Sequence, residues 1–436
     1  MKRKVLDALK EWKNSENRKV LLLRGARQVG KTYVARELGK EFSNFVEVNF
    51  EKNADIHHFF DENLDPDKIC TNLSAYFGVP IVEGQTLLFF DEIQSCPKAI
   101  QALRFFYEAK PGLHVIAAGS LLEFALEDLP SWGVGRIRSV FMYPMSFDEF
   151  LQASGQDALL EMKKNATASQ PLNLVFHNRL NELLRKFMLI GGMPEVVKTY
   201  ISNNTNFVAI QRVLSDITLS YIDDFVKYKR RSPLLRLREV MGAVIKQNGG
   251  KFIYSKAGNL SNPAQAKEAL DLLEMAGIVH KVFHASGQGI PIAAEVNYKK
   301  FKAFLHDTGV FLQNTGMKLS EFLVAENVDM LNKGNLAELF VATELVKYAD
   351  AHQRAQLYYW HREKRGSSAE IDFLTEHKNK IVPIEVKSGT SGKMQSMHLF
   401  LTEKEASKGI RISLENFSEY GKIEVVPLYA ISNLVG

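Results

Sequence analysis

Several features that mark particular classes of protein are missing from this 436-residue sequence. No run of about 18 apolar residues occurs, so the sequence predicts no membrane-spanning helix. Its two cysteines, Cys70 and Cys96, are too few for a disulfide framework or a zinc-ligand set. Residues 1–4 begin an amphipathic segment that lacks the apolar core and cleavage site of a signal peptide. These absences predict a cytoplasmic protein that does not act at a membrane.

Charge and composition exclude little. The 55 basic and 50 acidic side chains leave a net charge of +5, which is compatible with nucleic-acid binding but too small to argue for it. An apolar fraction of 46% and a charged fraction of 24% are ordinary for a globular protein. The length predicts about three domains at about 150 residues each, and nothing in the sequence indicates the oligomeric state.

The clearest motif that is present lies in residues 20–32, which read VLLLRGARQVGKT. An apolar strand, the pattern G-x-x-x-x-G-K-T and a helix-forming segment are typical of a phosphate-binding loop. Two glycines give the loop the backbone freedom to aim its N–H groups at phosphate, and the helix adds its positive N-terminal end. Lys31 is expected to contact the β- and γ-phosphates, and Thr32 to bind Mg²⁺. The predicted nucleotide-binding residues are Gly25, Ala26, Arg27, Gln28, Val29, Gly30, Lys31 and Thr32.

Two further apolar segments end in polar side chains. Residues 86–92 end in Asp91 and Glu92, and residues 114–118 are followed by a glycine and Ser120. In open α/β sheets, ligands bind beyond the carboxyl ends of the strands. We therefore expect Asp91 to bind the Mg²⁺ and Glu92 to polarise the attacking water. Ser120 is a candidate contact to the γ-phosphate or to that water.

These segments resemble the core of an AAA-type ATPase. Residues 135–138, residues 143–150 and the Gly-Gly-Met-Pro segment at 191–194 extend the resemblance to a large family of bacterial and archaeal ATP-binding proteins. In that family an AAA-type domain precedes a C-terminal region of unknown function. The resemblance implies ATP as the nucleotide, with Mg²⁺. It also implies that Arg136 acts as an arginine that stabilises the γ-phosphate, in its own subunit or in a neighbour's.

The predicted fold class is a multidomain α/β protein. Residues 1–150 alternate strands and helices and predict a P-loop AAA-type domain with a doubly wound sheet. Residues 151–228 predict a helical lid or linker region, with helices at 174–190 and 207–225. The expected third domain, at 229–300, is a winged helix, and the fourth, at 301–436, is a restriction-nuclease-like α/β domain.

The winged-helix prediction depends on the order of elements between residues 229 and 300. A helix at 234–247, a second short unit, a helix from Pro263 to Met275, and a strand turned at 287–289 follow one another. A basic cluster at the start suits phosphate contacts, although the acidic Glu268 and Asp271 on the third helix weaken base reading. Docking of a protein partner fits this segment equally well. The basic cluster comprises Lys227, Lys229, Arg230, Arg231, Arg236 and Arg238.

The last third contains a second group of chemically active residues. Asp372 lies on one expected strand, and Glu385 and Lys387 lie on the same face of the next, because strand side chains alternate with period two. An expected helix at 335–342 adds Glu338. These positions resemble those of the PD-(D/E)XK nuclease superfamily. The resemblance implies a Mg²⁺ or Mn²⁺ site at Asp372 and Glu385, with Lys387 and Glu338 as catalytic groups. A retained fold whose carboxylates pair with basic neighbours is the alternative.

Together these features predict an ATP-hydrolysing protein that couples nucleotide state to nucleic-acid binding, with DNA favoured over RNA, and metal-dependent cutting as a further step. One alternative is a regulatory ATPase without nuclease action, whose C-terminal domains bind a protein partner or DNA. Another is an ATP-driven DNA remodeller that does not cut. The Asp-Thr-Gly string at 307–309 does not indicate an aspartic protease, because Asp307 serves better as the N-cap of a helix.

Overall fold

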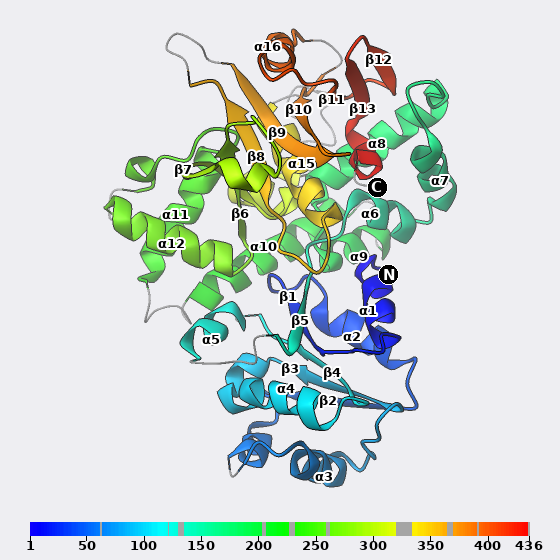
Figure 1. Cartoon of the computed structure of the whole chain (residues 1–436), viewed down its shortest axis with the longest axis vertical. Coiled ribbons are helices and arrows are strands. Elements are labelled where there is room, and N and C mark those ends of the chain that lie inside the picture. Colours follow the sequence, from blue (N-terminus) through cyan, green and yellow to red (C-terminus); the bar gives the residue numbers. More distant parts are fainter. Residues whose placement is uncertain are drawn as a thin grey trace. The chain divides into compact units, whose positions relative to one another are not determined.

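The computed structural model of the chain divides into two compact units, each described here by itself (Figure 1). Unit 1 comprises Met1–Tyr143 and Asp350–Arg354, and unit 2 comprises Pro144–Ala349 and Ala355–Gly436. The structure describes residues 1–434 apart from 62, 121, 130–134, 203–205, 226–231, 259–261, 320–333, 364–368 and 390–391. None of the helices in these described ranges is long and apolar enough to cross a membrane.

Unit 1 is built on a sheet of five parallel strands, as the sequence predicts. The strands have the order β2-β3-β4-β1-β5, and every neighbouring pair is parallel. Their carboxyl ends therefore meet at one edge of the sheet. The strands are β1 (Val20–Arg24), β2 (Asn44–Asn49), β3 (Thr86–Asp91), β4 (His114–Ala118) and β5 (Ile137–Phe141). The helices are α1 (Val5–Lys13), α2 (Lys31–Gly39), α3 (Pro66–Phe77), α4 (Pro97–Ala109) and α5 (Leu122–Asp128), with 3₁₀ turns η1 (Ala54–Phe60) and η2 (Ile93–Ser95).

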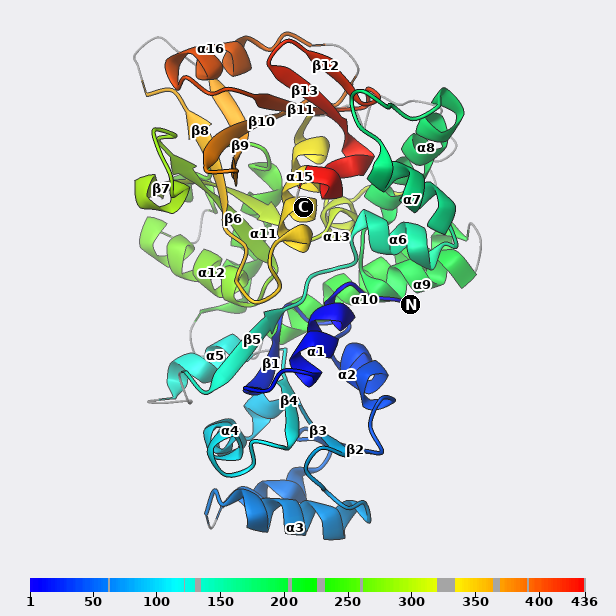
Figure 2. The same ribbon diagram turned by 45° about the vertical axis from the view of Figure 1, so that its right-hand side comes forward.

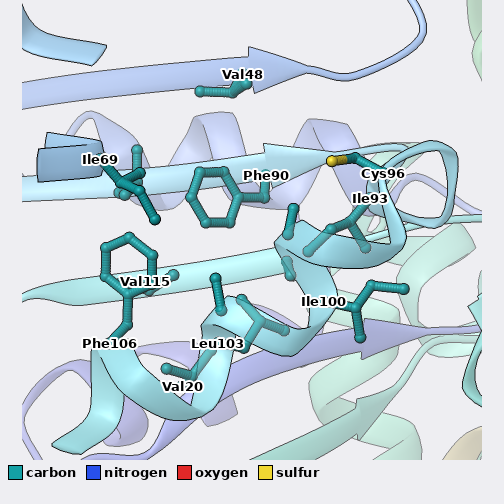
Figure 3. Close-up of a cluster of buried hydrophobic side chains, with 14 of the residues drawn as sticks. Val20, Val48, Ile69, Phe90, Ile93, Cys96, Ile100, Leu103, Phe106 and Val115 are labelled. Atoms are coloured by element: carbon teal, nitrogen blue, oxygen red, sulfur yellow. The ribbon is translucent and has the colours of Figure 1, made fainter. Parts of the chain in front are cut away.

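Helices cover both faces of this sheet, so its strands are apolar on both sides. Along β1, Val20 and Leu22 pack with α3 and α4, whereas Leu21 and Leu23 pack with α1 and α2. Figure 3 shows the first of these clusters, in which side chains of α3, η2 and α4 meet those of the strands. Cys96 is among them, buried and not disulfide-bonded. The alternation of β1 side chains explains why the sequence segment is apolar without a break.

His114 predicts how stability depends on pH. Burial between the rings of Trp12 and Phe42 lowers its pKa from 6.5 to about 4, and its Nδ1 has no hydrogen-bond partner. Between those two pH values the unfolded chain binds a proton that the folded chain excludes. The free energy of unfolding should therefore fall, by up to about 3 kcal/mol from this group, as the pH drops through that window. Urea unfolding at pH 7 and pH 4.5 checks this.

The His114→Gln variant should lose that part of the pH dependence. A matched control is His58→Gln, because His58 lies on the surface of the same unit, paired with Asp61. Equal pH slopes for wild type and His114→Gln would contradict the prediction.

A short segment from the second half of the chain completes unit 1. Residues Asp350–Arg354 lie alongside β5, the edge strand of the sheet. The Phe141 N–H donates a hydrogen bond to the Ala351 carbonyl at 2.7 Å. Arg354 lies 3.7 Å from a carboxylate oxygen of Glu123 and 5.9 Å from the ring centroid of Phe141. The outer backbone groups of β5 are thus partly covered by a segment about 200 residues away in sequence.

Unit 2 contains an eight-stranded mixed sheet with the order β12-β13-β11-β10-β9-β8-β6-β7 (Figure 2). Strand β9 is antiparallel to both of its neighbours, β8 and β10, and β11 joins β10 in parallel. The hairpin β6–β7 extends the same sheet, because β6 pairs with β8. The strands are β6 (Val279–Ala285), β7 (Val296–Leu305), β8 (Leu357–His361), β9 (Glu370–His377), β10 (Lys380–Val386), β11 (Gly409–Ser413), β12 (Ser418–Tyr420) and β13 (Ile423–Pro427).

Helices pack on both faces of this second sheet. α15 is buried almost all round, which its apolar sequence requires. α16 packs Met397 and Phe400 against Ile371 of β9, and Figure 2 shows α15 on the other side of these strands. The helices of unit 2 are α6 (Phe147–Ala153), α7 (Asp157–Asn165), α8 (Leu174–Ile190), α9 (Pro194–Ser202), α10 (Phe207–Asp224), α11 (Leu234–Lys246), α12 (Pro263–Met275), α13 (Thr308–Asn314), α15 (Gly334–Tyr348) and α16 (Gln395–Glu403), with 3₁₀ turns η4 (Tyr254–Lys256), η5 (Ile292–Glu295) and η7 (Leu428–Leu434).

The predicted helices at 174–190 and 207–225 are confirmed within one residue. Asp307 is confirmed as an N-cap, since its carboxylate accepts from the Val310 N–H at 3.0 Å. Its other oxygen accepts from the Gly192 N–H at 2.6 Å. A Cβ atom at Gly192 would lie 2.1 Å from the Met145 carbonyl oxygen, so this turn has no room for a side chain. The Gly-Gly-Met-Pro segment therefore has a structural role, because it allows this turn to pack closely within unit 2.

The elements expected between residues 229 and 300 occur in the order α11, η4, α12, β6 and β7. However, β7 runs from Val296 to Leu305, past residue 300, and its hairpin belongs to the eight-stranded sheet. The alternation of apolar side chains predicts each strand of the hairpin, but it does not predict that the hairpin pairs with a further strand, β8. The division of residues 151–436 into three domains stays a prediction.

Candidate nucleotide site and C-terminal carboxylate cluster

The predicted phosphate-binding loop connects β1 to α2 at the carboxyl edge of the first sheet. Gly25 has φ +141° and Gly30 has φ +97°, conformations that favour glycine. A Cβ atom at Gly25 would lie 2.1 Å from the carbonyl oxygen of Met142, the residue directly after β5, so the loop approaches the end of that strand too closely for a side chain. Ala26 and Val29 are buried and anchor the loop, whereas Gln28 is exposed and Arg27 is half-buried.

Lys31, the first residue of α2, points back into the loop. Its Nζ donates hydrogen bonds to the carbonyl oxygens of Gly25 at 2.9 Å and Ala26 at 2.8 Å. The side chain is 8% exposed, so the loop encloses its ammonium group. The phosphate oxygens of a nucleotide in the loop would meet this charge directly.

The Thr32 hydroxyl and the Asp91 carboxylate lie side by side, as the sequence predicts for a Mg²⁺ site. Thr32 Oγ1 donates to Asp91 Oδ2 at 3.1 Å, and Asn49 Nδ2 lies 3.3 Å from the same oxygen. Burial, followed by the neighbouring Glu92, raises the pKa of Asp91. A cation here would relieve that penalty, and both groups offer the hard oxygen ligands that Mg²⁺ prefers. The residues fit the ion.

Glu92 and Ser120 are also brought together. The Glu92 carboxylate accepts from the backbone N–H and the hydroxyl of Ser120, each at 3.3 Å, and from Gln94 Nε2 at 2.6 Å. Glu92 has φ +49°, a left-handed conformation that turns the chain at the end of β3. Sequence reasoning missed Asn49 and Gln94. Asn49 ends β2, and the rule that selected Asp91 could have found it.

Arg136 lies elsewhere. It immediately precedes β5, whose first residue, Ile137, pairs in register with Val20 at the start of the parallel β1. The phosphate-binding loop follows the opposite end of β1. Arg136 is paired with Glu108 and does not join the loop residues. A γ-phosphate role for Arg136 therefore stays a prediction only for the nucleotide of a neighbouring subunit.

The four predicted residues of the second group converge within unit 2. Glu338 lies on α15, Asp372 on β9 and Glu385 on β10, with Lys387 just after that strand. Lys387 Nζ lies 2.6 Å from Glu385 Oε1, and Asp372 Oδ2 accepts from the Val386 N–H at 2.8 Å. The side chains of Glu385 and Lys387 therefore do share a face.

The sequence analysis missed the central member of this group, Lys302 of β7. Its side chain is fully buried, and its Nζ lies 2.7 Å from Glu338 Oε1, 2.5 Å from Glu370 Oε1 and 3.8 Å from Asp372 Oδ1. We define these four side chains, together with Glu385 and Lys387, as the carboxylate cluster. The signal that could have revealed Lys302 is its place among apolar residues in the segment FKAFL at 301–305.

The charged groups of the carboxylate cluster shift one another's pKa values. Burial alone would lower the pKa of Lys302, but the carboxylates of Glu338, Asp372 and Glu370 outweigh it and raise that pKa. Burial, then Asp372, raises the pKa of Glu338, and the ion pair with Lys302 opposes that rise. Within the described part of the chain, no three His, Cys, Asp or Glu side chains are arranged to hold a metal ion. The expected Mg²⁺ or Mn²⁺ site at Asp372 and Glu385 thus gains no support.

Most of the predicted basic cluster lies outside the described residues. These members are Lys227, Lys229, Arg230 and Arg231. Arg236 and Arg238 lie on α11, half-buried and exposed respectively.

Comparisons with known proteins agree with the geometry of unit 1. Residues 17–151 match the family model described as an AAA domain. Residues 181–321 and 333–431 match two families, each described as a domain of unknown function (DUF8612 and DUF4143, respectively). The N-terminal part of the chain is thus an AAA-type ATPase domain, for which ATP and Mg²⁺ are the expected ligands. No curated protein matches the chain.

Several solved structures are similar at low scores. A Walker-type ATPase of Pyrococcus abyssi, PABY2304, has 16% identity and a TM-score of 0.44, covering 72% of this chain and 95% of its own. The Aeropyrum pernix ORC1 protein, solved in complex with DNA, has 15% identity and a TM-score of 0.28, covering 73% and 91%. Cdc6p of Pyrobaculum aerophilum has 13% identity and a TM-score of 0.26, covering 74% and 92%. Scores this low support no inference about this chain.

Proposed function

We propose that the chain hydrolyses ATP in unit 1 and uses the nucleotide state to control nucleic-acid binding by unit 2. The observation that carries the first half is the meeting of two pairs, Thr32 with Asp91 and Glu92 with Ser120, at the edge where the phosphate-binding loop lies. Lys31 binds the β- and γ-phosphates, Thr32 and Asp91 hold Mg²⁺, and Glu92 orients the attacking water. A Mg²⁺ held there would neutralise charge on the phosphates.

The nucleic-acid half is supported by the order of α11, η4, α12 and the hairpin β6–β7, which is that of a winged helix. Lys281 of β6 lies 2.6 Å from carboxylate oxygens of both Asp271 and Glu274 on α12. Lys281 therefore offsets one of these two negative charges, so α12 repels phosphate less than its sequence suggests. Arg236 and Arg238 add positive charge on α11.

The C-terminal part of unit 2 supports a nuclease-like fold. The succession α15, β8, β9, β10, α16 and β11 carries Glu338, Asp372, Glu385 and Lys387 at the positions expected from the PD-(D/E)XK resemblance. Cutting is not favoured, because the acids form ion pairs with Lys302 and Lys387. We therefore propose that this domain binds nucleic acid without cleaving it. A protein partner is the second candidate, favoured by Leu174, Val175 and Phe176, which are 66%, 71% and 37% exposed at the start of α8.

Anisotropy of labelled duplex DNA tests the proposal, with ATP, ADP or a non-hydrolysable analogue present. We expect binding that weakens at least about tenfold between 50 and 200 mM salt. We also expect binding to differ between the nucleotides in wild type but not in Lys31→Ala. Parallel lanes with Mg²⁺ and Mn²⁺ should contain no cleaved DNA. Absent or salt-independent binding would favour a protein partner, and cutting that Asp372→Ala abolishes would establish a nuclease.

A further inference from the structure

Lys302 is enclosed by groups from three other secondary-structure elements. It comes from β7, Glu338 comes from α15, Glu370 and Asp372 come from β9, and the Tyr359 ring of β8 lies 5.3 Å from its Nζ. Its side chain has no exposed surface. A lysine loses much hydration free energy in such a position, and only excellent pairing compensates. Two carboxylate contacts of 2.5 and 2.7 Å supply that pairing.

The charges of the carboxylate cluster divide unevenly around its two lysines. Lys387 pairs with Glu385 on β10, whereas Lys302 is the lysine whose Nζ contacts Glu338, Glu370 and Asp372. Three buried or half-buried carboxylates that converge from a helix and a strand are the oxygen ligands typical of a hard divalent cation. Here a protonated amine lies among them.

We propose that the Lys302 ammonium is the built-in cation of the carboxylate cluster, so that the cluster binds no divalent cation while Lys302 is in place. Once that ammonium is removed, Glu338, Glu370 and Asp372 can draw together around a Mn²⁺ or Mg²⁺ ion, an arrangement that the described residues do not have while Lys302 is in place. This inference rests on the nuclease-like arrangement proposed above, and it explains why that arrangement would bind nucleic acid without cutting it.

A second observation indicates that the cluster has unused ligand capacity. Glu385 is 5% exposed, and its Oε2 is buried without a hydrogen-bond partner, although Oε1 pairs with Lys387. The Tyr359 hydroxyl is likewise buried and has no partner. A buried carboxylate oxygen without a partner is costly in a finished structure. It is the group that a cation would be expected to engage.

Mn²⁺ binding to the full-length protein, followed by electron paramagnetic resonance without nucleotide, tests the proposal. Lys302→Met should gain one Mn²⁺ site, and the affinity of the carboxylate cluster for Mn²⁺ should rise roughly 100-fold or more over wild type, because a positive charge has left a buried acidic group. Its thermal unfolding temperature should rise with Mn²⁺ concentration. In wild type, Asp372→Asn should remove no Mn²⁺ site.

Lys281→Met is the matched control, because Lys281 is also a buried lysine with two carboxylate partners. It should gain no tight Mn²⁺ site, and Lys302→Met with Asp372→Asn should lose the one gained. A folded Lys302→Met without a new site would overturn the proposal. A Mn²⁺ site in wild type that Asp372→Asn removes would also overturn the proposal. The comparison of wild type with Asp372→Asn therefore tests the proposal even if Lys302→Met does not fold. DNA binding plays no part in these measurements, so they can fail while the proposed function holds.

Discussion

Glu92→Gln is expected to lower the rate of ATP hydrolysis by about 10²–10⁴-fold while ATP binding stays unchanged. The amide keeps the size of the side chain and can still accept from the Ser120 hydroxyl. It cannot accept a proton from water, so only the chemical step should suffer. Phosphate release gives kcat, and titration with a fluorescent ATP analogue gives Kd.

Glu41→Gln serves as the control for this prediction. Glu41 is a surface carboxylate of the same unit, paired with Lys10 and Lys13, and its neutralisation should leave kcat unchanged. Hydrolysis by Glu92→Gln at the wild-type rate would mean that another group orients the water. Weakened ATP binding in Glu92→Gln would instead give this carboxylate a role in holding the loop or the cation.

Lys31→Ala is expected to weaken binding of Mg²⁺-ATP by roughly 100-fold or more and to abolish measurable hydrolysis. The change removes a positive charge that the loop encloses, and it leaves the carbonyls of Gly25 and Ala26 without their donor. Calorimetric titration with ATP measures the loss. Lys31→Arg should rescue little, because two carbonyl contacts of 2.8 and 2.9 Å fit a compact ammonium group rather than a planar guanidinium.

The matched control is Lys40→Ala. Lys40 follows α2 on the surface and pairs with Glu37, so its loss should leave ATP affinity unchanged. Wild-type affinity in Lys31→Ala would refute the assignment of the loop as the phosphate site. If both variants bound ATP weakly, the effect would come from helix α2 rather than from contact with phosphate.

The arrangement of the candidate nucleotide site could be predicted from the sequence because each of its parts is local. Lys31 and Thr32 follow one strand directly, Asp91 and Glu92 end another, and parallel strands bring such ends together. The spacing of residues within each segment was therefore sufficient. Arg136 shows where this reasoning stops, since a motif position does not reveal at which end of the sheet the residue lies.

The carboxylate cluster was only partly predictable. Asp372, Glu385 and Glu338 could be selected because strand period and helical propensity place them. Lys302 could not, since its partners Glu338 and Glu370 lie 36 and 68 residues further along the chain. Its position depends on the pairing of the hairpin β6–β7 with β8. Which strand a hairpin pairs with is decided by long-range tertiary contacts, which the local sequence does not show. The apolar neighbours Phe301 and Ala303 predict that the Lys302 side chain is buried, but they do not indicate which carboxylates it contacts.

The segment Asp350–Arg354 has a consequence for how the protein folds as it is synthesised. Unit 1 is discontinuous in sequence, so the ribosome releases its last strand long before the segment that covers that strand's edge. At 5–20 residues per second, about 10–40 s separate the two events. Throughout that interval the Phe141 N–H lacks its Ala351 acceptor and β5 has an open edge, a state prone to pairing with other chains. A nascent chain of this protein therefore has reason to depend on chaperones until residue 354 has emerged.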